Sequence, residues 1–274
     1  MKTNPPVSVA VVIPTKERPL IMTAAVASVY NQTFLPKELV VVGESPSDIG
    51  KIPSHGTSGL AVRTTLLTST RTKNLSGSVN MALTHLLAED LLAENTYVAL
   101  LDDDDTWEPE YLERCITLAA SQNLDWVITG ITRHESEHGP GTKLSIPQAL
   151  TPSMFFATNP HVQGSNFFIR LSTLLKAGCF DENLQSTTDR DLCVRVLNLG
   201  DIKIGFVREY LVHHMAFAGN RLSTPDSPAK HQGLIAFYGK YAPLMLTKER
   251  SAFLDRATSV FSCPRSDFES GDKR

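Results

Sequence analysis

Short apolar runs alternate with stretches of helical periodicity along the first half of the chain. Residues 7–13 form a β-branched run that ends at Pro14, and residues 38–42 form a second apolar run that ends at Gly43. Between them, residues 20–30 place apolar side chains at helical spacing. Uninterrupted apolar runs of this length are typical of strands that are buried on both faces of a parallel sheet. The pattern therefore predicts a strand, a helix and a second strand.

The same alternation continues to residue 101. A segment rich in Pro, Gly and Ser at 45–59 is expected to be an exposed loop, and residues 60–67 are the third candidate strand. Residues 74–94 carry apolar side chains at helical spacing, and residues 97–101 form the next apolar run. Strands that alternate with helices predict an α/β fold with a single Rossmann-like, mostly parallel sheet flanked by helices. Such sheets bind ligands at the carboxyl ends of their strands.

The second half of the chain is less regular. Its patterns predict helices at 109–121, 171–177 and 189–199, and strands at 126–132, 163–169, 202–207 and 210–214. Residues 222–228 are rich in Ser, Thr and Pro, which indicates a linker. Two further helical patterns follow it, at 230–241 and 248–260.

Composition and charge narrow the functional classes. The 274 residues are 42% hydrophobic, which is enough for one large α/β domain with an appended element or for two small domains. Lys and Arg total 26 against 29 Asp and Glu, which gives a net charge of -3. This balance provides no broad basic surface, so we expect no nucleic-acid partner.

The cysteines and the hydropathy pattern indicate a cytoplasmic protein. The four cysteines are scattered singly, without the paired spacing of a zinc site, and are expected to be reduced thiols. The N-terminal residues lack the apolar core of a signal peptide, and no apolar span is long enough to cross a bilayer. We therefore expect no transmembrane segment.

Four consecutive aspartates, Asp102 to Asp105, directly follow the apolar run at 97–101. Adjacent carboxylates repel one another, so a folded chain needs a cation or several hydrogen-bond donors to neutralise them. Carboxylate oxygens are ligands that Mg²⁺ and Mn²⁺ prefer. A solvated acidic turn or an N-cap of the next helix is the alternative, but a cap needs only one acid. The run therefore favours a divalent-metal site at the end of a strand.

Four segments, in order, carry a resemblance to a known family. Residues 97–112, with the sequence YVALLDDDDTWEPEYL, resemble the Asp-x-Asp-Asp-x-Trp segment of family 2 glycosyltransferases, which have the GT-A fold. Residues 9–19 resemble the family's first strand and nucleotide loop, and residues 38–45 resemble its second strand and base-binding turn. Residues 163–191 resemble its acceptor-side block. The resemblance covers residues 7–223 and leaves the C-terminal helices without a counterpart.

With this resemblance, the patterns predict three parts of the chain. Residues 1–223 are expected to form the GT-A glycosyltransferase domain, with a nucleotide-binding half at 1–106 and an acceptor half at 107–223. Residues 224–262 are expected to form a C-terminal helical extension. The polar composition of residues 263–274 predicts a disordered tail.

The resemblance implies an inverting glycosyltransferase with a nucleotide diphosphate sugar, expected to be a UDP-sugar, as its donor. The anomeric carbon would pass through an oxocarbenium-like state while Mn²⁺ or Mg²⁺ offsets the charge of the departing diphosphate. One carboxylate would take the proton of the acceptor hydroxyl, which belongs to a saccharide, a lipid-linked or another acceptor. If the acceptor is a lipid, the protein would meet it peripherally, at the cytoplasmic face of the membrane.

On the donor side, the resemblance implies contacts with the base, the ribose and the phosphates. Four residues outside the acidic run are donor-side candidates: Thr15, Glu17, Glu44 and Asn74. Departures from the family's pattern at Lys16-Glu17, Gly43 and Val79 leave the identity of the base open. Within the acidic run, Asp104 matches the metal ligand, and Asp102 and Asp103 match positions near the ribose and the metal's water shell.

Two assignments near the metal keep an alternative. Asp105 is either a residue that orients the site or the cap of the helix that follows Trp107. The pair His213-His214 follows the predicted strand at 210–214, where related enzymes often place a His near the metal or the diphosphate. Imidazole is a fair ligand for Mn²⁺, so His213 is a candidate ligand, with a structural role for either His as the alternative.

Asp189 is the candidate general base, because the family's catalytic acid falls on this position at the start of a helix. Asp191 lies two residues further on and competes for the role, and N-capping of the helix is the alternative for either acid. The family's preceding Glu is Thr188 here. Arg221 could clamp a phosphate when a lid closes, or it could be a solvated surface residue.

The acceptor side is implied by matches in the least regular segments. The candidate acceptor-side residues are Trp107, Gly164, Ser165, Asn166 and Asp191. Trp107 could stack on a sugar ring, although an aromatic residue after a turn is more often part of the core.

Two other functions compete with glycosyl transfer. A sugar-phosphate nucleotidylyltransferase would open with a Gly-rich loop, and residues 15–19 contain no glycine. A non-catalytic binding or scaffold protein could keep the fold and use the C-terminal helices as its interaction surface. Asp104 and Asp189, both present, argue against the second alternative.

Overall fold

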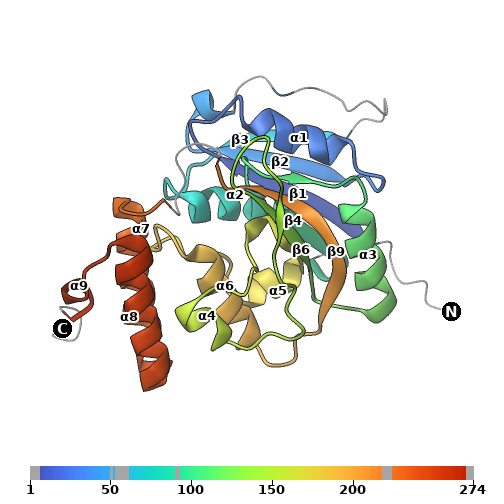
Figure 1. The fold of residues 1–274 in the computed structure, drawn as a ribbon. Coiled ribbons are helices and arrows are strands. Elements are labelled where there is room, and N and C mark those ends of the chain that lie inside the picture. Colours follow the sequence, from blue (N-terminus) through green and yellow to red (C-terminus); the bar gives the residue numbers. More distant parts are fainter. Residues whose placement is uncertain (1–6, 50–51, 53–61, 90–92, 218–223, 270–274) are drawn as a thin grey trace.

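A nine-stranded mixed sheet forms the centre of the molecule, with helices on both of its faces (Figure 1). The structure is a computed structural model that describes residues 7–49, 52, 62–89, 93–217 and 224–269. Within these residues the strand order is β3-β2-β1-β4-β8-β6-β9-β5, and β7 pairs with β6. The α/β fold expected from the sequence is confirmed.

The first half of the sheet is parallel. Its strands are β1 (Ser8–Thr15), β2 (Glu38–Gly43), β3 (Arg63–Thr68) and β4 (Thr96–Leu100). The helices α1 (Met22–Tyr30) and α2 (Leu75–Ala88) connect successive strands. Because β1, β2 and β4 are buried along almost their whole length, their sequences are continuous apolar runs.

The sheet divides the apolar core into two layers. Alternate side chains of β1 point to opposite faces, as a strand requires. Val9, Val11 and Ile13 pack toward α1 and α3 (Tyr111–Gln122), whereas Ala10 and Val12 pack toward α2. The second layer is the larger, because it continues under the helices that follow residue 170.

The second half of the sheet mixes the two strand directions. Strand β8 (Phe167–Arg170) runs antiparallel between β4 and β6 (Trp126–His134), and β9 (Ile204–Met215) lies parallel to β6. Two-residue strands pair antiparallel at the edge: β5 (Thr106–Trp107) with β9, and β7 (Thr142–Lys143) with β6. The helices of this half are α4 (Met154–Ala157), α5 (Leu171–Lys176) and α6 (Thr188–Leu197).

Two expected elements have different bounds in the structure. The expected strands at 202–207 and 210–214 form one strand, β9, because a register shift against β6 accommodates the exposed polar residues between them. The expected strand at 163–169 begins only at Phe167, since residues 164–166 form a 3₁₀ turn. This turn lies beside the acidic run.

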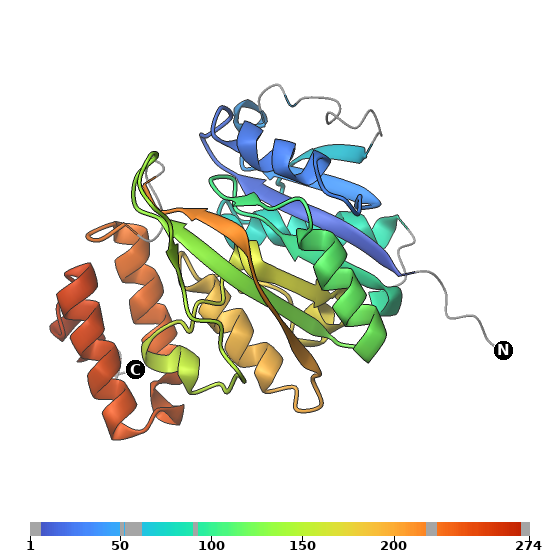
Figure 2. The ribbon, with the colours of Figure 1, turned by 45° about the vertical axis from the view of Figure 1, so that its right-hand side comes forward.

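The C-terminal helices α7 (Pro228–Tyr241) and α8 (Thr247–Phe261) lie next to α4 and α6, at one side of the sheet (Figures 1 and 2). Ser227 caps α7 by accepting the Lys230 N–H, and Pro228 stands at the first helical position. Phe237 and Phe253 are buried in the same apolar layer as α2 and α6. The two helices thus complete one face of the core.

The disordered tail expected at 263–274 is wrong for its first part. Residues Ser266–Glu269 form a short helix, α9, and the ring of Phe268 packs edge-on against Tyr238 and Phe253. A single buried aromatic residue explains the order of this polar segment. Residues 270–274 lie outside the described part of the chain. Among the described residues, no helix is long and apolar enough to cross a membrane.

Candidate active site

The acidic run forms a turn at the carboxyl end of β4, where the Asp105 N–H donates to the carbonyl oxygen of Asp102. The turn points the four carboxylates in different directions. Asp105 is fully buried, and its carboxylate accepts hydrogen bonds from the Ser165 hydroxyl at 2.6 Å and the Met215 N–H at 3.0 Å. Helix α3 begins six residues later, at Tyr111, so Asp105 is not its cap. Of the two roles expected for Asp105, the structure favours the orienting one.

Asp103 and Asp104 lie beside the loop after β1. The Thr15 hydroxyl donates to Asp103 at 2.7 Å, and one guanidinium nitrogen of Arg18 lies 3.2 Å from Asp103 and 3.0 Å from Asp104. Burial raises the pKa of the Asp103 carboxyl, although the hydrogen bonds from Thr15 and Arg18 act in the opposite direction. Sequence reasoning missed Arg18, whose only signal was its place in the resembling loop.

Asp102 and Asp189 come together at Gly164. The Gly164 N–H donates to the Asp189 carboxylate at 3.3 Å, and a Cβ atom at Gly164 would lie 3.0 Å from a carboxylate oxygen of Asp102. A side chain at this position would press on the Asp102 carboxylate, so glycine leaves room for both acids beside its backbone. Burial raises the pKa of Asp189 to about 6. Burial and the neighbouring carboxylates, Asp105 and Asp189 first among them, raise the pKa of Asp102 well above its usual range.

Three of the four aspartates could hold a metal ion. Asp102, Asp104 and Asp105 each offer a carboxylate oxygen, and these three oxygens lie within 4.8 Å of one another. An all-oxygen donor set of this kind fits Mg²⁺ or Mn²⁺, which would also relieve the repulsion that raises the pKa of Asp102. No other group of His, Cys, Asp and Glu in the described residues meets the same criterion.

The two histidines of β9 point to opposite sides, because successive residues of a strand alternate. His214 is buried, and its Nδ1 lies 3.1 Å from the Asp105 carboxylate and 3.0 Å from the Gln163 amide nitrogen. His213 instead contacts Glu108 at 2.8 Å and His134 at 3.0 Å. The structure does not bring His213 to the acids, and His214 is the member of the pair that contacts Asp105.

The loop expected to meet the nucleotide is held by ion pairs and one buried acid. Glu44 pairs with Lys16 at 2.8 Å, and Glu17 has a left-handed backbone with φ of 55°. The Asp48 carboxylate accepts the N–H groups of Glu17 at 3.0 Å and Ser45 at 2.7 Å. Burial raises the pKa of Asp48, but these amide hydrogen bonds outweigh it and hold the pKa below its usual value. Sequence reasoning missed Asp48.

Asn74, expected near the base and phosphates, is the N-cap of α2. Its side-chain oxygen accepts the Gly77 N–H at 2.8 Å, and its amide nitrogen donates to the carbonyl oxygen of Glu182 at 2.8 Å. The side chain is 6% exposed. The structure therefore gives Asn74 a local structural role, which the signal for a helix start also predicts.

Most of the expected acceptor-side residues are buried. The Trp107 ring is 4% exposed, stacks on Tyr111 and donates its N–H to the Ser165 carbonyl, so of its two expected positions it takes the one in the core. Asn166 is fully buried and donates to the Thr129 and His161 carbonyls, which gives it a structural role.

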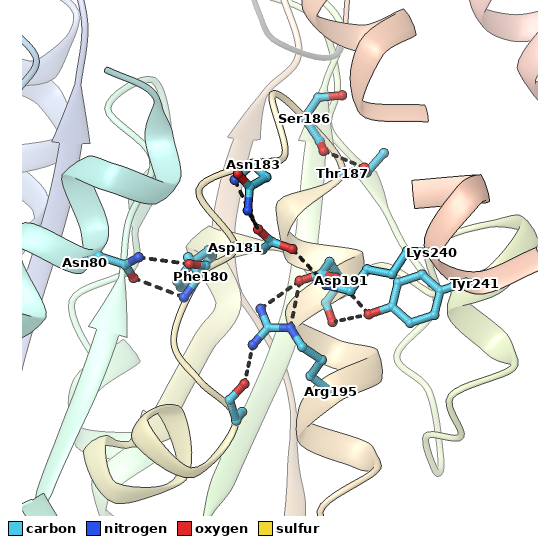
Figure 3. A network of polar contacts seen from close by, with 11 residues as sticks. Asn80, Phe180, Asp181, Asn183, Ser186, Thr187, Asp191, Arg195, Lys240 and Tyr241 are labelled. Carbon is cyan, nitrogen blue, oxygen red and sulfur yellow. Dashed lines mark hydrogen bonds and ion pairs between the residues drawn. The ribbon is translucent and has the colours of Figure 1, made fainter. Parts of the chain in front are cut away.

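Asp191 is also misplaced as an acceptor-side residue. Its side chain is fully buried and points toward Lys240 and Tyr241 at the end of α7 (Figure 3). Three side chains contact it within 2.8 Å: Arg195, Lys240 and Tyr241. Arg195 therefore pairs with an acid within the fold. Arg221 lies outside the described residues.

In α/β proteins ligands bind at the carboxyl edge of the sheet, which is where this chain places its acidic run and Arg18. The chain belongs to Glycosyl transferase family 2, whose sequence pattern matches residues 10–176. It is a glycosyltransferase of GT-A fold.

This chain is also similar to known glycosyltransferases in sequence and in fold. The chain is 24% identical over 254 residues to WcaA of Escherichia coli (strain K12), whose name describes a glycosyl transferase of colanic acid biosynthesis; the match covers 88% of this chain and 83% of WcaA. Residues 1–349 of S. aureus TarS, in complex with UDP-GlcNAc, share the fold with a TM-score of 0.64 and 15% identity, over 97% of this chain and 76% of that one. The mannosyltransferase PcManGT of Pyrobaculum calidifontis, with GDP-Man and Mn²⁺, has a TM-score of 0.56 and 14% identity, over 98% and 74%.

Proposed function

We propose that the protein is an inverting glycosyltransferase that moves a sugar from a nucleotide diphosphate, with a UDP-sugar as the leading candidate, to an acceptor hydroxyl. The observation that carries the proposal is the approach of Asp102 and Asp189 to the same glycine, Gly164, at the end of the acidic run. One acid belongs to the candidate metal group, and the other stands at the start of α6. The donor's diphosphate, bound through the metal, and the general base would thus both lie beside Gly164.

The donor would lie along the carboxyl ends of β1, β2 and β4. Thr15 and Asp103 would contact the donor on one side, and the Lys16–Glu44 pair would contact it on another. Arg18 places a positive charge between Asp103 and Asp104. The fold is shared with TarS in complex with UDP-GlcNAc and with PcManGT in complex with GDP-Man, which supports a nucleotide sugar as donor. We assign residues 1–106 to donor binding and residues 107–223 to the acceptor side.

Asp102, Asp104 and Asp105 would hold Mn²⁺ or Mg²⁺, which offsets the negative charge of the leaving diphosphate when it is bound. His214 and Ser165 fix the carboxylate of Asp105, and such outer contacts orient metal ligands. The PcManGT structure contains Mn²⁺.

Asp189 would act as general base toward the acceptor hydroxyl. A base works best when its pKa lies near the working pH, and burial raises the pKa of Asp189 to about 6. At neutral pH the carboxylate is therefore ionised, yet basic enough to accept the proton as the hydroxyl attacks the anomeric carbon. In one displacement the bond to the diphosphate breaks as the new glycosidic bond forms, so the configuration inverts.

The proposal is tested with a panel of UDP- and GDP-sugars, each with Mn²⁺, Mg²⁺ or a chelator, by following nucleoside diphosphate release and the anomeric configuration of the product. We expect a metal-dependent release with at least one donor. Asp189→Asn is expected to lower kcat by at least about 100-fold while donor binding is kept. The matched control is Asp201→Asn, the same change at an exposed position.

Two results would count against the proposal. Retention of the donor's anomeric configuration would exclude single displacement. Transfer by Asp189→Asn at the rate of Asp201→Asn would remove Asp189 as the base.

A further inference from the structure

The turn before Asp189 lies in close contact with the C-terminal helix α7. At Gly233, in the middle of α7, a Cβ atom would lie 2.1 Å from the Ser186 hydroxyl, 2.7 Å from the Ser186 nitrogen and 2.8 Å from its carbonyl oxygen. Two of these atoms belong to the backbone, so a side chain at 233 can be accommodated only if the turn moves. Glycine is therefore what lets α7 approach the segment that leads into α6.

Two hydroxyl groups of this turn contact the backbone of α7. The Ser186 hydroxyl donates to the Lys230 carbonyl at 3.4 Å, and the Thr187 hydroxyl donates to the Gly233 carbonyl at 3.2 Å. Thr187 has a φ of 61°, in the left-handed region that β-branched residues rarely adopt. A backbone in this conformation persists only where its surroundings hold it, and here α7 supplies them.

A second contact between α6 and α7 lies on the other side of Asp189. Asp191 accepts hydrogen bonds from Lys240 at 2.6 Å and from the Tyr241 hydroxyl at 2.7 Å, both at the end of α7 (Figure 3). Arg195 holds the other oxygen of the same carboxylate at 2.8 Å. The first turn of α6 is thus fixed to α7 both before and after Asp189.

Lys230 brings a positive charge from α7 toward Asp189. It is 9% exposed, and it lies over the ring of Phe261. Burial and the nearby cations Arg190 and Arg256 lower the pKa of Lys230 to about 8, while Asp189 acts in the opposite direction. The Asp189 carboxylate also repels that of Asp102. Asp189 therefore interacts electrostatically with an acid of the metal group and with a cation of the C-terminal helix.

We propose that α7 is a positioning element of the active site, in which Gly233 and Lys230 set where the Asp189 carboxylate stands relative to the acceptor hydroxyl. This rests on the proposed role of Asp189 as the base. It gives the C-terminal extension a part in the reaction, although both α6 and α7 lie beyond the family match at 10–176. Neither Gly233 nor Lys230 would touch the donor.

The test compares two glycine-to-alanine changes on the same helix. A Cβ atom at Gly239 meets nothing within 4 Å, so Gly239→Ala adds the same methyl group without moving the turn. We expect Gly233→Ala to lower kcat by about 10- to 100-fold, because a displacement of about 1 Å at a reacting group has such an effect. The donor KM should stay within about twofold, since the donor lies along other elements. Gly239→Ala should retain the kcat and the donor KM of the original chain.

A second pair of variants separates positioning from a general loss of stability. Phe268→Ala removes a ring that packs on Tyr238 and Phe253, so it weakens the packing of the C-terminal helices. Lys230→Met removes the cation near Asp189, and Lys230→Arg keeps it. We expect lower kcat for Lys230→Met, partial recovery for Lys230→Arg, and no change in kcat below the melting temperature for Phe268→Ala.

Two outcomes would overturn the proposal. Equal kcat for Gly233→Ala and Gly239→Ala would show that the contact does not act on the base. If kcat falls in proportion to the melting temperature in all three variants Gly233→Ala, Lys230→Met and Phe268→Ala, then α7 acts only as a structural support. Failure of the original chain to transfer any sugar would instead refute the proposed function, so the two failures are distinguishable.

Discussion

At the scale of single residues, the acidic run shows that identical side chains acquire different properties from what they touch. Asp105 is buried under Ser165 and His214, whereas Asp103 and Asp104 share Arg18. Asp102, which faces Asp189, has the pKa that is raised most clearly, by burial and by its acidic neighbours. The sequence distinguished the four acids only through the family resemblance, and it did not show which side chains each of them contacts.

The two adjacent histidines allow a prediction about the metal group. His214 contacts the carboxylate of Asp105, and loss of a side chain that orients a metal ligand typically weakens metal binding by about 10- to 100-fold. We therefore expect His214→Ala to raise the Mn²⁺ concentration for half-maximal activity by at least about 10-fold. His213→Ala, the matched control one residue away, should leave it within about twofold. The rate of sugar transfer is measured as a function of the Mn²⁺ concentration for each variant. Equal effects of the two variants would refute the role of His214 in orienting Asp105.

Trp107 supports a second prediction at this scale. Its buried N–H donates to the Ser165 carbonyl at 2.7 Å, so Trp107→Phe leaves that carbonyl without this donor. We expect a loss of about 1 to 3 kcal/mol in the free energy of unfolding, measured by urea denaturation. The acceptor KM should stay unchanged, because the ring is buried and stacks on Tyr111. A raised acceptor KM without loss of stability would restore the sugar-stacking role.

At the scale of elements, polar side chains in loops hold neighbouring helices together through hydrogen bonds. The segment after α5 is joined to α2 by Glu182, which accepts hydrogen bonds from Asn80 at 2.8 Å and Arg71 at 2.6 Å. Burial raises the pKa of Glu182, but hydrogen bonds from Asn80, Thr72 and Arg71 outweigh it and bring the pKa to about 2. The backbone of the same residue receives the Asn74 amide.

This carboxylate predicts a pH dependence of stability. Because the pKa of Glu182 is lower in the folded chain than the usual 4.5, its contribution is complete above pH 4.5 and is lost as the pH falls toward 2. Glu182→Gln should therefore cost about 1 to 3 kcal/mol of unfolding free energy at pH 7, and the difference should narrow below pH 4.5. Urea unfolding of both chains at several pH values measures it. A difference that is constant with pH would contradict the assignment.

The elements that the sequence predicted well are those whose signal is local. The strands of the parallel half follow from continuous apolar runs, and α2 and α3 follow from periodicity, because burial on two faces or along one stripe leaves a direct trace. The single strand β9 was expected as two, since its exposed polar centre resembles a turn unless the register shift against β6 is known. The 3₁₀ turn at 164–166 was not predicted, because its hydrogen bonds join it to Asp105 and Asp189, which are distant in sequence.

The candidate site was predictable only where a short motif carries the chemistry. Asp102 to Asp105 stand together in the chain, so their place at the end of a strand could be inferred. Arg18 and Asp48 act through contacts with residues more than 30 positions away, which no local pattern encodes. Trp107 and Asp191 were assigned to the acceptor because the sequence does not say which way a side chain points. Both are buried instead.

At the scale of the whole molecule, the C-terminal helices belong to the same core as the sheet. Arg190, on α6, donates to the carbonyls of Phe155 and Phe156 and lies over the ring of Phe237, 4.4 Å from its centre. Burial of a guanidinium costs free energy unless its N–H groups find acceptors. The two carbonyls accept these N–H groups, and the ring of Phe237 contacts the face of the cation. The helices therefore contribute to the fold of the part that precedes them.

Truncation after residue 223 tests this view of the molecule, because the sequence suggested a domain that ends there. The shortened chain would lose the rings of Phe237, Phe253 and Phe261 from the core and uncover Arg190. Removal of one buried aromatic ring costs about 3 to 5 kcal/mol, which alone approaches the stability of a typical domain. We therefore expect no cooperative thermal transition by circular dichroism and strong binding of an apolar dye. A chain truncated after residue 269 is the matched control and should melt as the full chain does. A cooperative transition of the shorter chain at the same temperature would show that residues 1–223 fold independently and that the C-terminal helices are an accessory.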